Sequence, residues 1–215
     1  MHKLLESVDF AHPRAPTTEQ ALLAARELGI RASKRECEEV ASLVAAASAS
    51  QAGPSARVAA AQHVRREHPF ALALAPQEPL LTGVIDLLAR ERDGSFLVLD
   101  YKSDRVGGEE DLAELVAREY ELQRRLYALA VLRDGAPAVE IVHWFLRRPD
   151  DWVSASFAAG DLGALEDDLR GRIQRAHAAG FAVSEHPHRG LCETCPGRLS
   201  LCSWSDAQTM RERRE

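Results

Sequence analysis

The chain has 215 residues, enough for one domain of ordinary size, and 46% of them are hydrophobic while 28% are charged. The formal net charge of −6 argues against a protein that holds nucleic acid by bulk charge alone, although a bound metal can supply local positive charge. No apolar run reaches the roughly 20 residues that a membrane helix needs, and the N-terminal segment lacks the apolar stretch of a signal peptide. We therefore expect a soluble, cytoplasmic globular protein without membrane contact.

The N-terminal quarter of the chain is predicted to be helical. Helices are expected over residues 2–10, 17–29 and 33–50. Ser33 and Glu36 match the capping box that starts the third helix. The segment 51–55, which contains glycine and proline, is expected to break the helical pattern. Residues 1–53 are therefore assigned to a helical N-terminal part.

The following residues alternate between strands and helices. Short β-rich runs predict strands within residues 63–74, 79–91, 95–103, 138–148 and 152–159, and helices are expected over 109–132 and 161–179. We expect one domain, residues 1–215, of the α/β class. Its core, residues 62–180, would hold a mixed central sheet flanked by helices, and residues 186–204 would form a cysteine-rich C-terminal clasp.

The stretch "FLVLDYKSDR", residues 96–105, places charged residues on an apolar strand. Successive side chains of a strand alternate between faces, so Asp100 and Lys102 point to one face and Tyr101 to the other. Isolated charges at such a position would be costly to bury. The pair therefore requires a partner or a ligand.

The hairpin before this strand decides which residue lies beside Asp100. A two-residue turn would place Asp86 opposite Tyr101, whereas a three-residue loop over residues 92–94, ending on a left-handed glycine, would place Asp86 across from Asp100. Two adjacent carboxylates repel each other unless a cation lies between them, and Mg²⁺ accepts such ligands together with phosphate oxygens. The alternative is a buried Asp–Lys salt bridge, with Asp86 only capping a turn.

Five motifs in order resemble a known nuclease family. "GVIDLL" (83–88) followed by "LDYKSDR" (99–105) resembles the paired signature of the PD-(D/E)XK nuclease superfamily, and more closely that of the RecB/AddA-type nuclease domain of helicase–nucleases. "MHKLLESVDF", "VRREHPFAL" and "YELQRRLYALA" are similar to three further motifs of that family. The resemblance covers essentially the whole chain and implies a restriction-endonuclease-like fold.

The resemblance also implies a metal site. Asp86 and Asp100 would bind Mg²⁺ or Mn²⁺, the carbonyl oxygen of Tyr101 would contribute, and His2 would be a further ligand or line the site. The alternative for His2 is an exposed N-terminal histidine. Such a metal would polarise the scissile phosphate and lower the pKa of the attacking water.

Two further residues would act in catalysis according to the resemblance. Lys102 would orient or help to deprotonate the attacking water and offset charge in the transition state. Glu67 would touch a second metal or the water, or alternatively pair with Arg65 or Arg66 at the surface.

One helix is the candidate contact for DNA. Tyr120, Gln123 and Tyr127 are spaced i, i+3, i+7 and share a helix face, so they could stack on and hydrogen-bond to a DNA strand. Alternatively, the tyrosines pack the helix on the sheet. The candidate phosphate contacts, which could equally form a solvated helix face, are Lys102, Arg105, Arg118, Arg124 and Arg125.

The cysteines of the C-terminal segment have the spacing C-x2-C-x6-C, formed by Cys192, Cys195 and Cys202. Three clustered thiols in a cytoplasmic chain indicate metal binding more than disulfides. The spacing resembles the clasp that holds a [4Fe-4S] cluster in some relatives, where one distant cysteine is the fourth ligand. That cysteine usually precedes the histidine motif, whereas Cys37 follows His2, so either Cys37 is the fourth ligand or this ligand is lost. Zinc bound with His186 or His188, or no metal, are the alternatives. His143, on an apolar strand, is interpreted as a core residue.

The resemblance implies a metal-dependent DNA nuclease, and specifically an exonuclease that acts on single-stranded ends during double-strand-break repair and recombination. The chain has no G-x-x-x-x-G-K-[ST] loop, so a helicase motor would lie on another part of the same protein or on a partner. The alternatives are a catalytically silent DNA-binding or scaffold module, an interaction domain stapled by metal, and an exonuclease of the CRISPR-associated type.

Overall fold

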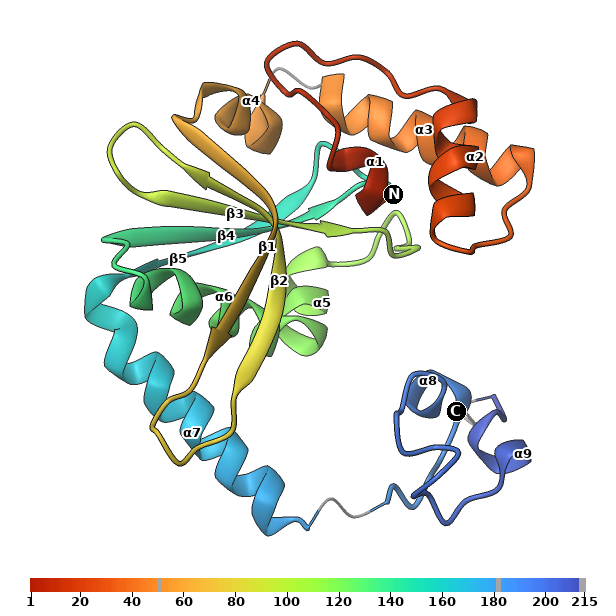
Figure 1. Cartoon of the computed structure of the whole chain (residues 1–215), viewed down its shortest axis with the longest axis vertical. Helices are drawn as coiled ribbons and strands as arrows, with labels where there is room; N and C mark the ends of the chain where they lie inside the picture. Colours follow the sequence, from red (N-terminus) through yellow and green to blue (C-terminus); the bar gives the residue numbers. More distant parts are fainter. Residues whose placement is uncertain (50–51, 181–182, 213–215) are drawn as a thin grey trace. The chain divides into compact units, whose positions relative to one another are not determined.

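The computed structural model describes residues 1–49, 52–180 and 183–212, and it is built around a five-stranded sheet (Figure 1). The strands are β1 (His63–Leu72), β2 (Leu81–Arg90), β3 (Phe96–Lys102), β4 (Ala138–Phe145) and β5 (Trp152–Ala158). They are adjacent in chain order; β3 and β4 run parallel and the other neighbours antiparallel. The predicted strands and the predicted mixed α/β sheet are confirmed.

The N-terminal part is helical, as predicted, but the first helix ends at Leu5 and not at Phe10. Its helices are α1 (His2–Leu5), α2 (Thr18–Glu27), α3 (Lys34–Ala49) and α4 (Gly53–Ala60). The predicted capping box of α3 forms, since Glu36 N donates to Ser33 Oγ and Ser33 N donates to the Glu36 carboxylate at 2.7 Å. The expected break is confirmed, since α3 ends at Ala49 and Ala52 is extended (φ −132°, ψ 169°) before α4 begins. Pro54 lies in the first turn of α4, where its missing N–H would have no helical partner.

The predicted helix over residues 109–132 is two helices, α5 (Leu112–Glu119) and α6 (Glu121–Arg133). Tyr120 separates them with φ −120° and ψ 1°, outside the helical region. Its ring stacks on His143 of β4 with a centroid distance of 5.6 Å. A contact between distant parts of the chain therefore coincides with the break, and the local pattern could not show it.

The two faces of the sheet are covered by different helices (Figure 1). Helices α1 to α4 contribute Leu5, Val44 and other apolar residues to a core that covers one face. On the other face lie α5 and α6, where Val116 packs near Phe145 of β4. The strand β3 is thus central and covered on both sides, which explains why its seven residues are nearly all buried.

The register of the β2–β3 hairpin matches the three-residue loop. Leu87 pairs with Leu99, and Glu91 N donates to Ser95 O at 2.9 Å. Gly94 has φ +88°, the left-handed conformation that this loop requires and that glycine adopts without strain. One step beyond the Leu87–Leu99 pair, where the ladder ends, this register sets Asp86 across from Asp100.

The chain divides into two compact units, Met1–Asp168 and Leu169–Glu215. Helix α7 (Leu162–Ala178), which follows the short 3₁₀ turn Ala159–Asp161, crosses this boundary, and the second unit also holds α8 (Arg189–Cys192) and α9 (Asp206–Thr209). The division of a single domain into parts at residues 1–53, 62–180 and 186–204 stays a prediction. No helix of the described residues has the length and apolarity that crossing a membrane requires.

Candidate active site

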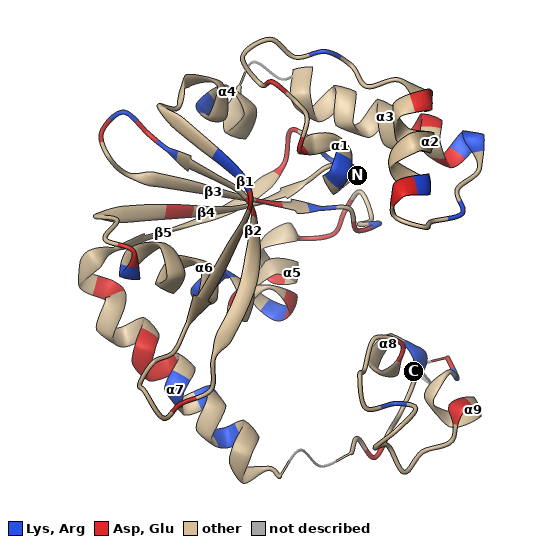
Figure 2. Cartoon of the chain, in the orientation of Figure 1, with Lys and Arg blue, Asp and Glu red and all other residues tan. Residues whose placement is uncertain are grey.

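Four polar residues occupy matching positions on neighbouring strands. The β1–β2 register, in which Arg66 pairs with Leu87 and His68 with Ile85, sets Glu67 across from Asp86. The β2–β3 register sets Asp86 across from Asp100, and Asp100 pairs with His143 of β4. In Figure 2, red acidic positions lie near the point where β1, β2 and β3 overlap in this view, and blue basic positions are also present on these strands. The sheet therefore assembles these side chains from four separate stretches of sequence.

Three of the potential ligands meet at one point. His2, Glu67 and Asp86 each offer a ligand atom, and these atoms lie within 4.8 Å of one another. His2 Nδ1 is 3.4 Å from Asp86 Oδ1, and His2 Nε2 is 3.1 Å from the carbonyl oxygen of Tyr101. The hydrogen bond to Asp86 raises the pKa of His2. The structure thus brings His2, Asp86 and the Tyr101 carbonyl together, as the sequence predicts.

Glu67 is held in an unusual conformation at this point. It has φ +46°, in the left-handed region that a non-glycine residue rarely adopts. Burial, and next the negative charge of Asp86, raise the pKa of the Glu67 carboxyl. The alternative, a surface ion pair with Arg65 or Arg66, does not form among the described residues; Arg66 instead donates to the carbonyl of Val8 at 2.6 Å. Glu67 therefore belongs to the ligand group.

Asp86 is oriented by the backbone of β3. Its Oδ2 accepts a hydrogen bond of 2.8 Å from the amide of Tyr101, and 11% of its side-chain surface is exposed. The backbone pairing between β2 and β3 ends at the Leu87–Leu99 pair, so the Tyr101 amide bonds to this side chain and not to the backbone of β2. One carboxylate oxygen is thereby fixed on the strand while the other faces His2.

Asp100 and Lys102 form a buried ion pair. Asp100 Oδ2 lies 2.7 Å from Lys102 Nζ, with 4% and 10% of the respective side chains exposed. Burial raises the pKa of Asp100 to about 6, against the opposing effect of the lysine charge. Asp100 does not belong to the group formed by His2, Glu67 and Asp86.

The Lys102 ammonium has two further contacts from the α5–α6 region. It donates to Gln123 Oε1 at 2.8 Å and lies 3.7 Å from the centroid of the Tyr120 ring, a cation–π distance. Gln123 in turn donates to Tyr127 Oη at 2.9 Å, and that hydroxyl donates to the carbonyl of Val84. Tyr120, at the α5–α6 junction, and Gln123 of α6 thus hold the lysine in this structure, and contact of this region with DNA stays a prediction.

The donor set fits a hard divalent cation. Carboxylate oxygens, a backbone carbonyl oxygen and an imidazole nitrogen are ligands that Mg²⁺ and Mn²⁺ accept. Glu67 and Asp86 are two carboxylates in mutual repulsion, which a cation between them would relieve. The residues present therefore match the metal that the sequence predicts at this position.

The arginines proposed as phosphate contacts differ in their surroundings. Arg124 and Arg125 both pair with Glu121, and Arg118 pairs with Glu119. Arg105 is exposed in the loop after β3 and forms no ion pair among the described residues. Arg105 is therefore the predicted contact whose charge is least neutralised.

His143 is a site residue whose role the sequence did not reveal. It is fully buried, as predicted for a core histidine, yet neither ring nitrogen has a hydrogen-bond partner among the described residues. Its Nε2 is 3.6 Å from Asp100 Oδ2. Burial, and then the charge of Lys102, lower the pKa of His143 to about 3, so the ring is neutral beside the ion pair. The sequence signal that could have indicated a site residue was a single histidine among the apolar residues of a strand.

The four cysteines lie in different units. Cys37 is buried in the core cluster of the first unit, and Cys192, Cys195 and Cys202 belong to the second. In the second unit, Cys195 N donates to Cys192 O at 3.1 Å, so a turn joins these two residues. The three C-terminal thiols, all within the described residues, do not form a ligand group like that of His2, Glu67 and Asp86. A cysteine clasp is not seen.

Comparison with known proteins gives the same family as the motifs. An ATP-dependent helicase/nuclease subunit of Desulfitobacterium hafniense (strain DSM 10664 / DCB-2) is 42% identical over 78 residues, which are 34% of this chain and 6% of that protein. The corresponding helicase/nuclease subunit of Bacillus licheniformis is 37% identical over 87 residues, 33% of this chain and 7% of that protein. The matched region is therefore a small part of these relatives.

Among solved structures, one described as "Crystal structure of SSO0001" matches 64% of this chain and 61% of its own, at 14% identity and a TM-score of 0.34, too low to support an argument. A family model described as the PD-(D/E)XK nuclease superfamily matches residues 1–202. The predicted superfamily, and a distant relation to the nuclease region of AddA-type helicase/nucleases, are thereby confirmed. The chain belongs to the PD-(D/E)XK nuclease superfamily.

Proposed function

We propose that this chain is a metal-dependent deoxyribonuclease that hydrolyses phosphodiester bonds, and specifically an exonuclease acting on single-stranded DNA ends. The observation that carries the proposal is the buried Asp100–Lys102 pair on the central strand, set beside a carboxylate pair and a histidine. A structural salt bridge alone would not require Glu67 in a strained conformation across from Asp86.

The ligand group would hold Mg²⁺ or Mn²⁺. His2, Glu67 and Asp86 would bind the ion, with Asp100 and the Tyr101 carbonyl at its border. Such an ion supplies the positive charge that polarises a scissile phosphate and acidifies a water. Asp86, fixed by the Tyr101 amide, would present one defined oxygen.

Lys102 would act on the reacting groups themselves. Asp100, Gln123 and the Tyr120 ring hold its ammonium in one position, so it can orient the attacking water and offset charge on the phosphorus oxygens in the transition state. Because the lysine is already ordered, little reorganisation is needed at the moment of reaction. Gln123 and Tyr120 are positioning residues in this scheme, and contact with DNA would be a second role for them.

We further propose that the domain works with a helicase motor in double-strand-break repair and recombination. Support comes from the relation to the helicase/nuclease proteins and from the lack of a P-loop in this chain. A motor on the same or another chain would deliver single-stranded ends to the site.

The test is a cleavage assay with end-labelled linear DNA, single- and double-stranded, and with closed circular single strands. With Mg²⁺ or Mn²⁺ we expect the linear single strand to be degraded, the circle to resist, and EDTA to stop the reaction. Lys102→Ala should reduce the rate at least about a hundredfold. Lys34→Ala, which changes an exposed lysine of α3 paired with Glu38, is the matched control and should retain full activity.

Two results would contradict this function. Cleavage of circles would exclude an obligate exonuclease, and equal rates for Lys102→Ala and Lys34→Ala would exclude the proposed site. No cleavage with any metal, in a preparation that binds Mn²⁺, would favour the catalytically silent module.

The C-terminal cysteines are proposed to bind a [4Fe-4S] cluster, with zinc as the alternative ion. The support is the C-x2-C-x6-C spacing and the turn between Cys192 and Cys195, with Cys37 as candidate fourth ligand. Metal analysis of protein purified without oxygen distinguishes the cases. About four irons per chain would support the cluster, one zinc would support the alternative, and neither metal would exclude both.

A further inference from the structure

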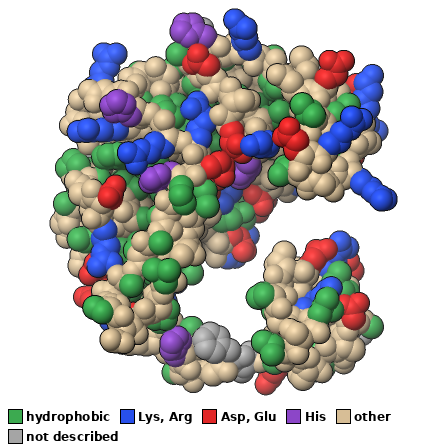
Figure 3. All heavy atoms as spheres, in the orientation of Figure 1, with side chains coloured by type: hydrophobic (Ala, Val, Ile, Leu, Met, Phe, Trp, Pro, Cys, Tyr) green, Lys and Arg blue, Asp and Glu red, His purple; other side chains and the backbone are tan. Residues whose placement is uncertain are grey.

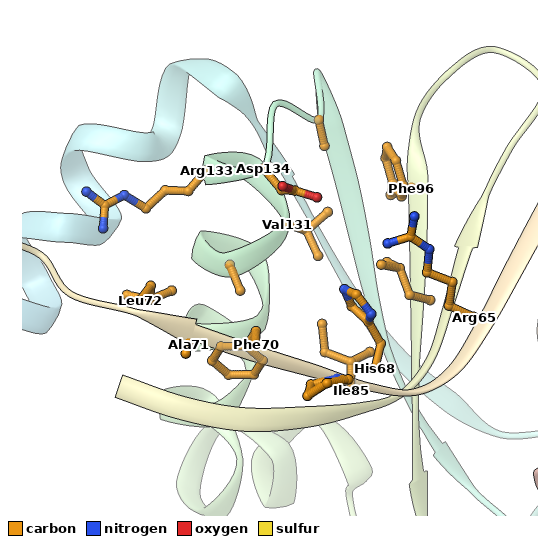
Figure 4. Close-up of a pocket in the computed structure, with 14 residues that line it drawn as sticks. Arg65, His68, Phe70, Ala71, Leu72, Ile85, Phe96, Val131, Arg133 and Asp134 are labelled. Atoms are coloured by element: carbon orange, nitrogen blue, oxygen red, sulfur yellow. The ribbon is translucent and has the colours of Figure 1, made fainter. Parts of the chain in front are cut away.

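A groove runs along β1 on the α6 side of the sheet, outside the ligand group. It has a volume of about 440 Å³, and its walls are β1, β2 and the start of β3 on one side and the C-terminal end of α6 on the other. A second hollow of about 450 Å³ shares Arg65, Leu88, Phe96 and Asp134 with it. The two therefore form one continuous groove, of which Figure 4 shows the part beside α6.

The groove is positively charged although the chain is acidic. Arg65 and Arg90 are exposed and form no ion pair among the described residues, and His63 and His68 lie beside them on β1. Asp134 is the one acid among the described residues that line either part. Figure 3 shows basic and histidine side chains gathered over the region of β1 and the β2–β3 hairpin. This charge would attract a polyanion.

Aromatic and apolar side chains form the floor of the groove. Phe96 lies with Arg65 and His68 at one end, and Phe70 lies near Ala71 and Leu72 at the other (Figure 4). Both phenylalanines are only partly buried, so ring surface remains accessible. Alternating cations and aromatic faces are what single-stranded nucleic acid requires, because phosphates pair with the cations and bases stack on the rings. An acidic peptide would use the cations but has no need for the rings.

The groove is joined to the active site by a chain of contacts. The ring of Phe70 packs edge-on against Tyr127 with a centroid distance of 6.0 Å. Tyr127 is bonded to Gln123, and Gln123 to Lys102. In addition, β1 and β2, which line the groove, carry Glu67 and Asp86 at their centre. One ligand could therefore occupy both places.

We infer that this groove binds a segment of single-stranded DNA, with Arg65 and Arg90 contacting phosphates and Phe96 stacking on a base, while another part of the same strand lies at Lys102. The inference rests on the proposed function and adds a second contact region to it. The groove would retain the strand between successive cleavage events.

The test measures binding separately from cleavage. Fluorescence anisotropy of a labelled oligothymidylate is recorded in EDTA with the Lys102→Ala protein, across a series of salt concentrations. Adding Arg65→Ala and Arg90→Ala should lower the slope of log affinity against log salt by about 0.7 for each phosphate that the protein no longer neutralises. Phe96→Ala should weaken binding about tenfold. Asp134→Asn, which removes the acid from the groove, should strengthen binding.

Arg14→Ala is the matched control, since Arg14 is exposed near the N-terminus and forms no ion pair among the described residues. If the groove variants bind with the affinity and salt slope of Arg14→Ala, the inference is wrong. The same holds if Asp134→Asn fails to strengthen binding. The binding assay does not depend on cleavage, so its result can be interpreted even if the separate cleavage assay shows the parent protein to be inactive. That inactivity would refute the proposed function. If the parent protein cleaves DNA and the groove variants bind DNA as tightly as Arg14→Ala does, only the inference that the groove binds DNA is refuted.

Discussion

Glu67 combines two unfavourable features at a single residue. Its φ of +46° costs about 1–2 kcal/mol for a residue with a Cβ, and its carboxyl lies across from Asp86 with a raised pKa. Nothing in the packing of the exposed Glu67 side chain explains why this cost is retained. A requirement for a carboxylate at this position does explain it, since strained residues concentrate at functional sites.

Glu67→Gly should therefore stabilise the protein by up to about 1 kcal/mol and abolish cleavage, because glycine adopts this φ freely but offers no ligand. Glu67→Gln is the comparison, because it removes the charge and keeps the backbone constraint. Urea denaturation in EDTA measures both variants. If Glu67→Gly is less stable than Glu67→Gln, the strain is not real.

The raised pKa of Asp100 predicts a pH dependence of stability. A carboxyl whose pKa is about 6 when folded and near 3.8 when unfolded binds more protons in the folded state between these values, so its contribution falls as pH rises from about 4 to about 6. The loss is at most about 3 kcal/mol. In EDTA, the free energy of unfolding of the parent, taken relative to Asp100→Asn, should decrease across this window. A constant or rising difference would show that burial does not dominate the titration of Asp100.

Secondary-structure elements were predictable from sequence wherever their signals are local. The turn residues limited the β2–β3 register to two alternatives. The hydrogen bond from Glu91 N to Ser95 O and the left-handed Gly94 show that the three-residue loop forms. The facing of Glu67 and Asp86 was not predictable, because the connection between β1 and β2 carries no turn signal that fixes a register. The break at Tyr120 coincides with a contact to His143, which is 23 positions away in the sequence and gives no local signal.

Gly83 shows how one position supports the packing between two strands. A Cβ at this position would lie 2.6 Å from Cε1 of Phe70. Gly83→Ala should therefore displace Phe70 from its contact with Tyr127 and destabilise the protein by about 1–3 kcal/mol. Gly107→Ala, where no atom lies within 4 Å, is the control and should change stability by less than about 0.5 kcal/mol. The denaturant midpoints of the two variants measure this difference. Equal midpoints would mean that the Phe70 ring moves aside without loss of stability.

At the scale of the whole molecule, the ligand group connects parts that are distant in sequence. His2 belongs to α1, Glu67 to β1 and Asp86 to β2. The sequence predicted His2 and Glu67 only through the resemblance of their motifs, whereas the hairpin register also pointed to Asp86. Composition and local periodicity give no information about which distant segments meet. A cation bound at this point would tie the N-terminal helix to the sheet.

Metal binding should therefore raise the unfolding temperature of the Met1–Asp168 unit. A ligand that binds only the folded state at about 100 times its Kd stabilises it by about 2.7 kcal/mol, which corresponds to a shift of roughly 5–10 °C for a chain of this size. Differential scanning calorimetry with Mn²⁺, against EDTA, measures the shift. Asp86→Asn should remove it, since that side chain is central to the group. His2→Ala should reduce it, because it removes one ligand and the link to α1. His12→Ala, which changes an exposed histidine near Asp9, should keep the full shift. If Mn²⁺ raises the unfolding temperature of Asp86→Asn as much as that of the parent, the ion binds elsewhere and the carboxylates of the sheet are not its ligands.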